Sequence, residues 1–135
     1  MNNSHQESIP SRGGLWAGRI LTGFVVLFLV VDACMKIVFV TQVRQASVQL
    51  GWPTEAVIPL GILLLTCALL YAYPRTAFLG AVLLTGYLGG AVATHWRIGN
   101  PLLTHTLFGV YVGVAMWAGL YLRDARLRKM VPWQK

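Results

Sequence analysis

The sequence predicts an all-α integral membrane protein, an up-down bundle of four transmembrane helices, on three observations. Hydrophobic residues make up 56% of the 135 residues and charged residues only 11%, against about a quarter in soluble domains. Four apolar stretches approach the ~20 residues that a helix needs to cross roughly 30 Å of hydrocarbon. Only short connections separate them, so little of the chain remains for a soluble domain. The stretches are residues 21–40, 57–73, 77–96 and 102–122.

The distribution of basic residues predicts the orientation of the bundle. The net charge of +7 would suit a nucleic-acid-binding protein, but the basic residues stand at the ends of apolar stretches rather than on one polar face. We therefore expect the lipid bilayer, and no nucleic acid, as their partner. With a cytoplasmic N-terminus, only Lys36, Arg44 and Arg97 of the eleven lysines and arginines fall on the opposite side. The positive-inside rule thus predicts that both termini are cytoplasmic.

The chain is expected to form one membrane domain between two short tails. Residues 1–16 are predicted to be a flexible cytoplasmic tail, because MNNSHQESIPSR is polar and has no apolar period. Residues 17–128 form the membrane domain, and residues 129–135 form a basic cytoplasmic tail. The first apolar stretch is longer than the core of a signal peptide and more spans follow it, so we expect it to remain in the protein.

The connection after the first span predicts a short helix in the outer membrane interface. In TQVRQASVQLGWPT, Val43, Ala46, Ser47 and Leu50 share one helical face, whereas most of the polar residues lie elsewhere. Gly51 can supply the left-handed residue that ends this helix. A plain loop is the alternative, because short elements are hard to assign from sequence.

The other connections predict that consecutive spans are antiparallel neighbours. Pro74 disfavours helix for the residue before it and Thr76 can cap the next helix, so a tight turn joins spans two and three. The third and fourth spans carry small residues at helical spacing, which let helix backbones approach closely in lipid. These residues serve packing within the bundle or, alternatively, a homo-oligomer. The predicted packing residues are Ala81, Thr85, Gly86, Gly89, Gly90, Gly109 and Gly113.

The stretch VVDACMK places two charges, Asp32 and Lys36, inside the first span. They are four residues apart, so their side chains share a helix face and can pair. An intramembrane carboxylate or ammonium costs roughly 2.5 to 3.5 kcal/mol on insertion scales, which makes such residues functional candidates. Lys36 can snorkel to the outer boundary, whereas Asp32 lies roughly 12 Å deep by helix rise and cannot. The alternative is a purely structural ion pair.

The predicted topology brings most of the remaining ionisable residues to the outer half of the bundle. The third span ends there, the fourth begins there, and the loop before the second span lies on the same side. His95 is the candidate proton-active group, since imidazole changes charge between about pH 5 and 8. The planar guanidinium of Arg97 suits a carboxylate or an oxygen-rich head group. The candidate ligand-binding or proton-relay residues are Asp32, Lys36, Glu55, Tyr87, Thr94, His95, Arg97, Asn100 and His105.

Metal binding and nucleophilic catalysis have little support in the sequence. No HxxxH or ExxH pair places two ligands on one helix face, so no metal site is expected. Cys34 and Cys67 form no CxxC motif and are interpreted as small buried hydrophobes. There is no GxSxG motif, and the catalytic residues stay unassigned. For the histidines and Arg97, hydrogen bonding or anchoring at the interface is the alternative to a role in a site.

One block of the sequence resembles a known family. The block YPRTAFLGAVLLTGYLGGAVATHWRIGNPLLTH, with ILTGFVVLFLVVDACMK and the closing YLRD, resembles the DoxX-like family of small bacterial four-helix membrane proteins. This resemblance, over residues 19–128, implies a multi-pass protein of the bacterial inner membrane, related to the DoxX subunit of thiosulfate:quinone oxidoreductase. Asp32 and Lys36 then correspond to a polar pair of the first helix, and His95 and Arg97 to the ATHxR end of the third. Some relatives carry an acid where this chain has Leu64, which weakens the case for an independent enzyme.

Three hypotheses for the function follow. The first is an accessory of a membrane oxidoreductase, associated with quinone or electron transfer, whose outer-half pocket binds a head group or relays protons. Quinone is the cofactor that the resemblance implies, and a membrane redox protein is the implied partner. The second hypothesis is a non-catalytic structural or assembly subunit of a membrane complex. The third is a permease for small solutes or protons, to which four spans without an obvious repeat are poorly suited.

Overall fold

The computed structural model describes residues 11–38 and 40–131. Helices account for most of these residues, and no strand occurs among them. Residues 1–10, 39 and 132–135, which cover most of both expected tails, lie outside the described residues. The elements are α1 (Arg12–Val38), α2 (Val40–Gln49), the 3₁₀ turn η1 (Thr54–Ala56), α3 (Val57–Ala72), α4 (Ala77–Arg97), the π-helical turn η2 (Leu102–Thr106), α5 (Phe108–Arg123) and α6 (Ala125–Met130).

Four helical segments are long and apolar enough to cross a membrane. Large apolar side chains face outward from each of them, and Phe24 of α1, for example, is 69% exposed. An apolar surface of this extent suits lipid rather than water. The predicted fold class, an all-α membrane protein with four spans, is confirmed. The segments are Arg12–Val38, Thr54–Ala72, Ala77–Arg97 and Leu102–Arg123.

The first helix begins earlier than the sequence indicated. α1 starts at Arg12, so residues 12–16, which were predicted to belong to the N-terminal tail, continue the helix of the first span. Ser11 explains the difference, because its Oγ accepts a hydrogen bond from the Gly14 N–H (3.2 Å), the contact of an N-cap. This cap stabilises the first turn of α1, which contains Gly13 and Gly14 and lacks the regular spacing of apolar residues that would predict a helix.

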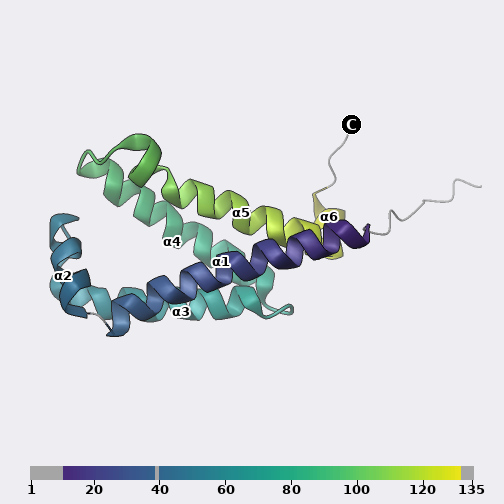
Figure 1. Cartoon of the computed structure of the whole chain (residues 1–135), viewed down its shortest axis with the longest axis horizontal. Coiled ribbons are helices and arrows are strands. Elements are labelled where there is room, and N and C mark those ends of the chain that lie inside the picture. Colours follow the sequence, from purple (N-terminus) through teal and green to yellow (C-terminus); the bar gives the residue numbers. More distant parts are fainter. Residues whose placement is uncertain (1–10, 39, 132–135) are drawn as a thin grey trace, which may run out of the picture.

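The four spans form a ring in which each helix contacts two neighbours. α1 packs against α3 and α5, and α4 packs against the same two helices. Over the described residues no close backbone contact joins α1 to α4 or α3 to α5, so these pairs are diagonal. Figure 1 shows α6 and the start of α1 at one end of the bundle and α2 at the other. We call these the α6 end, which is the predicted cytoplasmic side, and the α2 end.

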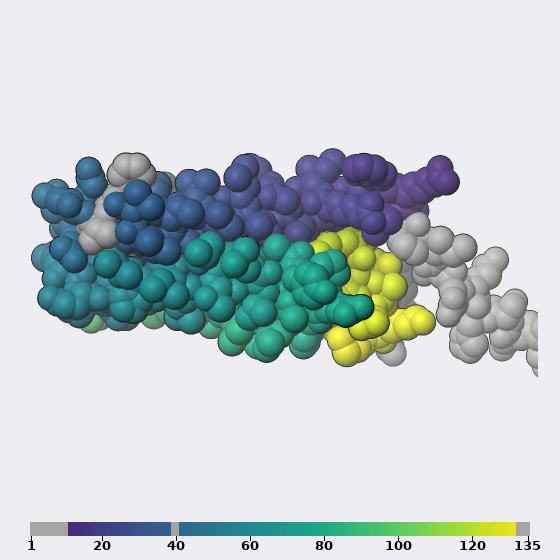
Figure 2. All heavy atoms as spheres, turned by 90° about the horizontal axis from the view of Figure 1, so that it is seen from below, coloured from purple at the N-terminus to yellow at the C-terminus, as the bar shows by residue number. Residues whose placement is uncertain are grey.

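The bundle is closed at the α6 end and spread at the α2 end. In Figure 1 the α1–α3 pair and the α4–α5 pair meet near the α6 end and separate toward the α2 end. Figure 2 shows α1 and α3 side by side along the length of the bundle. α2 is the predicted interfacial helix, with Val43, Ser47 and Leu50 half-buried on one face. Gly51 follows it in the left-handed conformation, with a φ of 78°.

Glycines stand at close approaches of every neighbouring pair of spans. A Cβ on Gly18 would lie 2.8 Å from the Leu122 Cβ, so α1 and α5 are nearly in backbone contact. Small residues permit such contacts, which stabilise helix pairs in lipid. The contacts are Gly18 with Leu122 (α1–α5), Gly61 with Lys36 (α1–α3), Gly80 with Tyr71 (α3–α4) and Gly109 with Leu88 (α4–α5).

The predicted packing residues are divided between the bundle and its surface. Gly86, Gly89 and Gly90 are exposed, and a Cβ added to any of them would meet nothing within 4 Å. They lie on faces of α4 that do not pack against another span. The helical spacing of small residues does not show which of them contact a neighbouring helix. The other predicted residues lie in the core or contact another span: Ala81, Thr85, Gly109 and Gly113.

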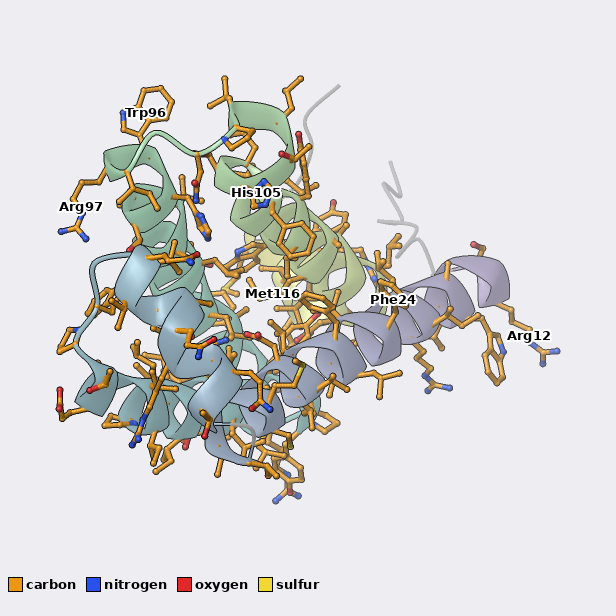
Figure 3. All side chains as sticks on the ribbon, turned by 60° about the vertical axis from the view of Figure 1, so that its left-hand side comes forward. Arg12, Phe24, Trp96, Arg97, His105 and Met116 are labelled. Atoms are coloured by element: carbon orange, nitrogen blue, oxygen red, sulfur yellow. The ribbon has the colours of Figure 1, made fainter. Side chains whose placement is uncertain are left out.

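Tyr71 organises the core near the α6 end. It is fully buried on α3, and its hydroxyl donates to the Met116 carbonyl of α5 (2.7 Å), which ties two diagonal helices together. Figure 3 shows Met116 in the interior between the helices. Arg123 Nη2 donates to the Tyr71 carbonyl (2.8 Å), and Leu127 of α6 is buried in the same cluster. The α6 end is therefore held by packing and by buried hydrogen bonds.

Candidate functional site

Asp32 and Lys36 form an ion pair within α1. The Lys36 Nζ lies 2.5 Å from Asp32 Oδ2, which is the pairing expected of residues at positions i and i+4. The stem of Lys36 packs beside Gly61 of α3. The Lys36 side chain is 20% exposed and that of Asp32 is 40% exposed. Because both partners belong to one helix, their pairing does not by itself hold α1 to another span.

Tyr87 is a predicted site residue of α4, the helix diagonal to α1. Its phenol interacts electrostatically with Asp32 and with the thiol of Cys67, and its ring is half-buried against the core. α1 and α4 are diagonal helices, so the interaction with Asp32 reaches across the centre of the bundle. Asp32 and Lys36 are thus directly paired, whereas Tyr87 is linked to them only by this longer-range electrostatic interaction.

His95, Asn100 and His105 form a second polar group at the α2 end. Asn100 Nδ2 lies 2.6 Å from His95 Nδ1, and an amide N–H donates, so a neutral His95 carries its proton on Nε2. The ring centroids of His95 and His105 are 6.2 Å apart. His95 is half-buried and His105 is exposed. This group thus presents an imidazole N–H at the end of α4 that faces the predicted outer side.

Arg97 holds the end of α4 against the loop after α2. Its Nη2 donates to the Leu50 carbonyl (3.0 Å) and lies beside Gly51. Figure 3 shows Arg97 pointing toward this loop, on another side of α4 from His105. A pocket of about 390 Å³ adjoins the contact, lined by Gly51, Trp52, Pro53, Ala93, Thr94 and Arg97. The predicted partner of Arg97 was a carboxylate or an oxygen-rich head group, and its partner in the structure is the Leu50 carbonyl.

Glu55 and Thr94 lie apart from the ion pair. Glu55 is exposed, accepts a hydrogen bond from Thr54 Oγ1 (3.0 Å) and interacts electrostatically with Arg44 of α2. Thr94 donates to the Gly90 carbonyl of its own helix (2.8 Å). The nine predicted site residues thus fall into four places: the ion pair with Tyr87, the histidines with Asn100, Arg97 with Thr94 beside the small pocket, and Glu55 with Thr54.

The thiols and histidines do not assemble into a metal centre in the described part of the chain. Within residues 11–38 and 40–131, no three His, Cys, Asp or Glu side chains are placed to hold a metal ion together. His95 and His105 offer two nitrogen ligands, whereas protein zinc sites use three or four protein ligands. Cys34 is exposed on α1 and Cys67 is buried on α3, both as free thiols.

A groove between α4 and α5 was not predicted from the sequence. It has a volume of about 710 Å³ and is lined mainly by apolar side chains. Gly89 and Gly113 leave the space open, and Trp117 and Tyr121 form a wall. The signal in the sequence is the combination of small residues on one span with aromatic residues on the next. It can be interpreted only once the two helices are placed side by side.

A comparison with protein families matches most of the bundle. The model of the DoxX-like family matches residues 20–119, from the first turns of α1 into α5. All nine predicted site residues lie within the matched region. No curated protein and no solved structure matches the chain.

Proposed function

This chain belongs to the DoxX-like family, and we propose that, as a multi-pass membrane protein, it binds the polar head group of a lipid-soluble ligand, a quinone, at the α2 end. The observation that carries the proposal is the placement of Asp32. Its carboxylate lies inside a membrane span and pairs with Lys36, and it is within electrostatic range of Tyr87 on the diagonal helix α4. Intramembrane ionisable residues in such a position are functional candidates by default.

The donors at this site fit the head group of a quinone. A quinone presents carbonyl oxygens that accept hydrogen bonds, and the Lys36 ammonium and the Tyr87 hydroxyl are donors on two different helices. When bound, a quinone supplies a two-electron, two-proton couple. Asp32 would orient Lys36 toward the ligand.

The histidine group supports a role in proton exchange at the same end. His95 and His105 are close neighbours, with ring centroids 6.2 Å apart, and imidazoles change charge near neutral pH. Asn100 leaves the Nε2–H of a neutral His95 available as a donor. We therefore assign these rings the transfer of protons between the head group and the aqueous side. Electrons would come from a membrane redox partner.

The test compares Asp32→Asn with Asp124→Asn. Asp124 makes a matched control, because it caps α6 at the opposite end through a bond from the Arg126 N–H (2.8 Å), and asparagine is an equally good cap. Quinone extracted from the purified proteins is quantified, and a short-chain quinone is titrated by quenching of tryptophan fluorescence. We expect Asp32→Asn to weaken binding about tenfold, the effect of losing a charge-assisted hydrogen bond, and Asp124→Asn to leave it unchanged.

Two outcomes would contradict this proposal. One is a folded Asp32→Asn variant that binds quinone as tightly as the parent protein. The other is a parent protein that retains no quinone and binds none on titration. Either result would favour the alternative, an assembly subunit of a membrane complex. That alternative is supported by Gly86 and Gly90, whose exposed face of α4 has room for another helix.

A further inference from the structure

The groove between α4 and α5 opens on a side of the bundle that belongs to neither polar group. Its lining comes from α4, α5, α6 and Val131, with no contribution from α1 or α3. Gly89 and Gly113 form part of its floor, where a Cβ on Gly89 would meet nothing within 4 Å. The groove is therefore a hollow in a surface that we expect to face the bilayer.

The walls of the groove are apolar because their polar groups are already hydrogen-bonded. Trp117 Nε1 donates to Thr85 Oγ1 (2.9 Å), and Thr85 Oγ1 donates to the Ala81 carbonyl (2.8 Å). The Trp117 ring is held from the other side by an edge contact with Phe78, with centroids 5.9 Å apart. A hydrocarbon chain fits such a wall, whereas a polar ligand would find few unpaired groups there.

The length of the groove matches one leaflet of a bilayer. From Val110 to Tyr121, both of which line it, α5 rises about 16 Å at ~1.5 Å per residue. This is close to half of the roughly 30 Å hydrocarbon core. Leu127 and Val131 continue the lining at the α6 end, so a chain lying in the groove would belong to the leaflet on the α6 side.

The α6 end of the groove is strongly basic. α6 contains Arg126, Arg128 and Lys129. Arg128 Nη1 donates to the carbonyls of Tyr121 (2.9 Å) and Leu122 (2.7 Å), which places its guanidinium beside the groove. Asp124 is the one carboxylate of this segment, and it accepts the Arg126 N–H as the cap of α6. Basic clusters at a membrane surface attract anionic lipid head groups.

We propose that the α4–α5 groove and α6 together bind one anionic phospholipid. One acyl chain lies along Gly89, Gly113 and Trp117, and the phosphate lies against the cations of α6. A second copy of the chain fits this surface poorly. A symmetric dimer with its axis along the membrane normal would bring two basic α6 segments together on the same side, and their charges would repel each other.

The first experiment fills the groove. Gly89→Leu places a side chain in the hollow, and Gly86→Leu is the matched control, because Gly86 is equally free of neighbours within 4 Å and does not line the groove. Each protein is exposed in detergent to equal amounts of phosphatidylglycerol and phosphatidylcholine with identical acyl chains, and retained lipid is counted by native mass spectrometry. We expect Gly89→Leu to lose most retained phosphatidylglycerol and Gly86→Leu to keep it.

The second experiment removes charge from α6. The double variant Arg126→Gln, Lys129→Gln leaves Arg128 and its two carbonyl contacts in place. Its control is Arg12→Gln, Arg75→Gln, which removes the same charge from the same end; Figure 3 shows Arg12 on the first turn of α1. We expect the parent protein to prefer phosphatidylglycerol, and the α6 variant to reduce that preference about tenfold. The control should keep the preference.

Three outcomes would overturn the proposal. Equal retention of phosphatidylglycerol and phosphatidylcholine by the parent protein would show that α6 selects no head group. Unchanged lipid retention in Gly89→Leu would show that the chain does not occupy the groove. A dimer that Gly89→Leu dissociates would assign the groove to a second copy. None of these results depends on quinone binding at the α2 end, so this proposal and the proposed function fail separately.

Discussion

The two ends of the bundle are built on different principles. At the α6 end Tyr71 is fully buried and bonded to Met116, and Gly18 brings α1 against α5. At the α2 end the helix pairs separate (Figure 1), and Asp32 and His95 are only half-buried. The close approach of α1 and α3 persists at Gly61 and Lys36, so the spread separates the α1–α3 pair from the α4–α5 pair and not α1 from α3. We therefore expect the α6 end to contribute more to the stability of the bundle than the α2 end.

The position of the charges follows from this division. An ion pair buried between tightly packed helices would lose its hydration without room for further hydrogen bonds, which is costly. Asp32 and Lys36 instead lie where α1 has moved away from α5, and Lys36 is close to the end of its helix. Both side chains remain partly exposed, so they keep part of their hydration, which makes a charged pair less costly within a membrane span.

The largest effect is expected from Gly80→Leu at the turn between α3 and α4. A Cβ at this position would overlap the backbone of Tyr71, which cannot move without separating the two helices. We expect a loss of about 3 kcal/mol or more in the free energy of unfolding, at the upper end of overpacking effects. Unfolding in detergent, followed by circular dichroism, measures it. Gly90→Leu is the control on the exposed face and should change stability by less than about 1 kcal/mol.

A smaller effect is expected from removing one buried hydroxyl. Tyr71→Phe deletes the donor to the Met116 carbonyl while keeping the ring. We expect a loss of about 1 to 2 kcal/mol, because a buried partner is left without its hydrogen bond. Tyr111→Phe removes an exposed hydroxyl that donates to the Leu103 carbonyl (3.1 Å) nearer the α2 end and should cost less than about 0.5 kcal/mol. If both variants lost the same free energy of unfolding, the α6 end would not contribute more to stability than the α2 end.

The spans and their order could be predicted because they depend on local sequence. Apolar length, the turn at Pro74 and the apolar face of α2 are each contained in one short window of sequence, and the structure has the elements that they indicate. The start of α1 at Arg12 was missed, since the cap at Ser11 precedes a turn without apolar period. Local chemistry predicts the elements well and predicts their ends less well.

Contacts of the candidate site could be predicted from the sequence only where both residues belong to the same helix. The Asp32–Lys36 pair follows from a spacing of four residues, and the structure contains it. The separation of Arg97 from Asp32 could not be foreseen, because it depends on how far α4 diverges from α1 at the α2 end. The glycines at Gly18, Gly61 and Gly80 were likewise missed, since a glycine that touches another helix looks no different in sequence from an exposed one.

The smallest effect on stability is expected from Arg97→Gln at the α2 end. The change removes the bond from Nη2 to the Leu50 carbonyl, which joins α4 to the loop after α2. Since the Arg97 side chain is exposed, we expect the free energy of unfolding to fall by less than about 0.5 kcal/mol. Local opening should increase instead, with hydrogen exchange at the Gly51 and Trp52 amides about fivefold faster, the effect of losing ~1 kcal/mol of local contact.

Hydrogen exchange measured by mass spectrometry distinguishes local opening of the loop after α2 from a loss of global stability. Gly51 N–H and Trp52 N–H donate to the Val48 and Ser47 carbonyls (3.0 and 2.9 Å), so their exchange reports on opening of this loop. Arg44→Gln is the control, because it removes an exposed cation from α2 and leaves the Leu50 contact intact. A fall in global stability as large as that of Tyr71→Phe would mean that Arg97 helps to hold the whole bundle together. The α2 end would then contribute to the global stability of the bundle as the α6 end does.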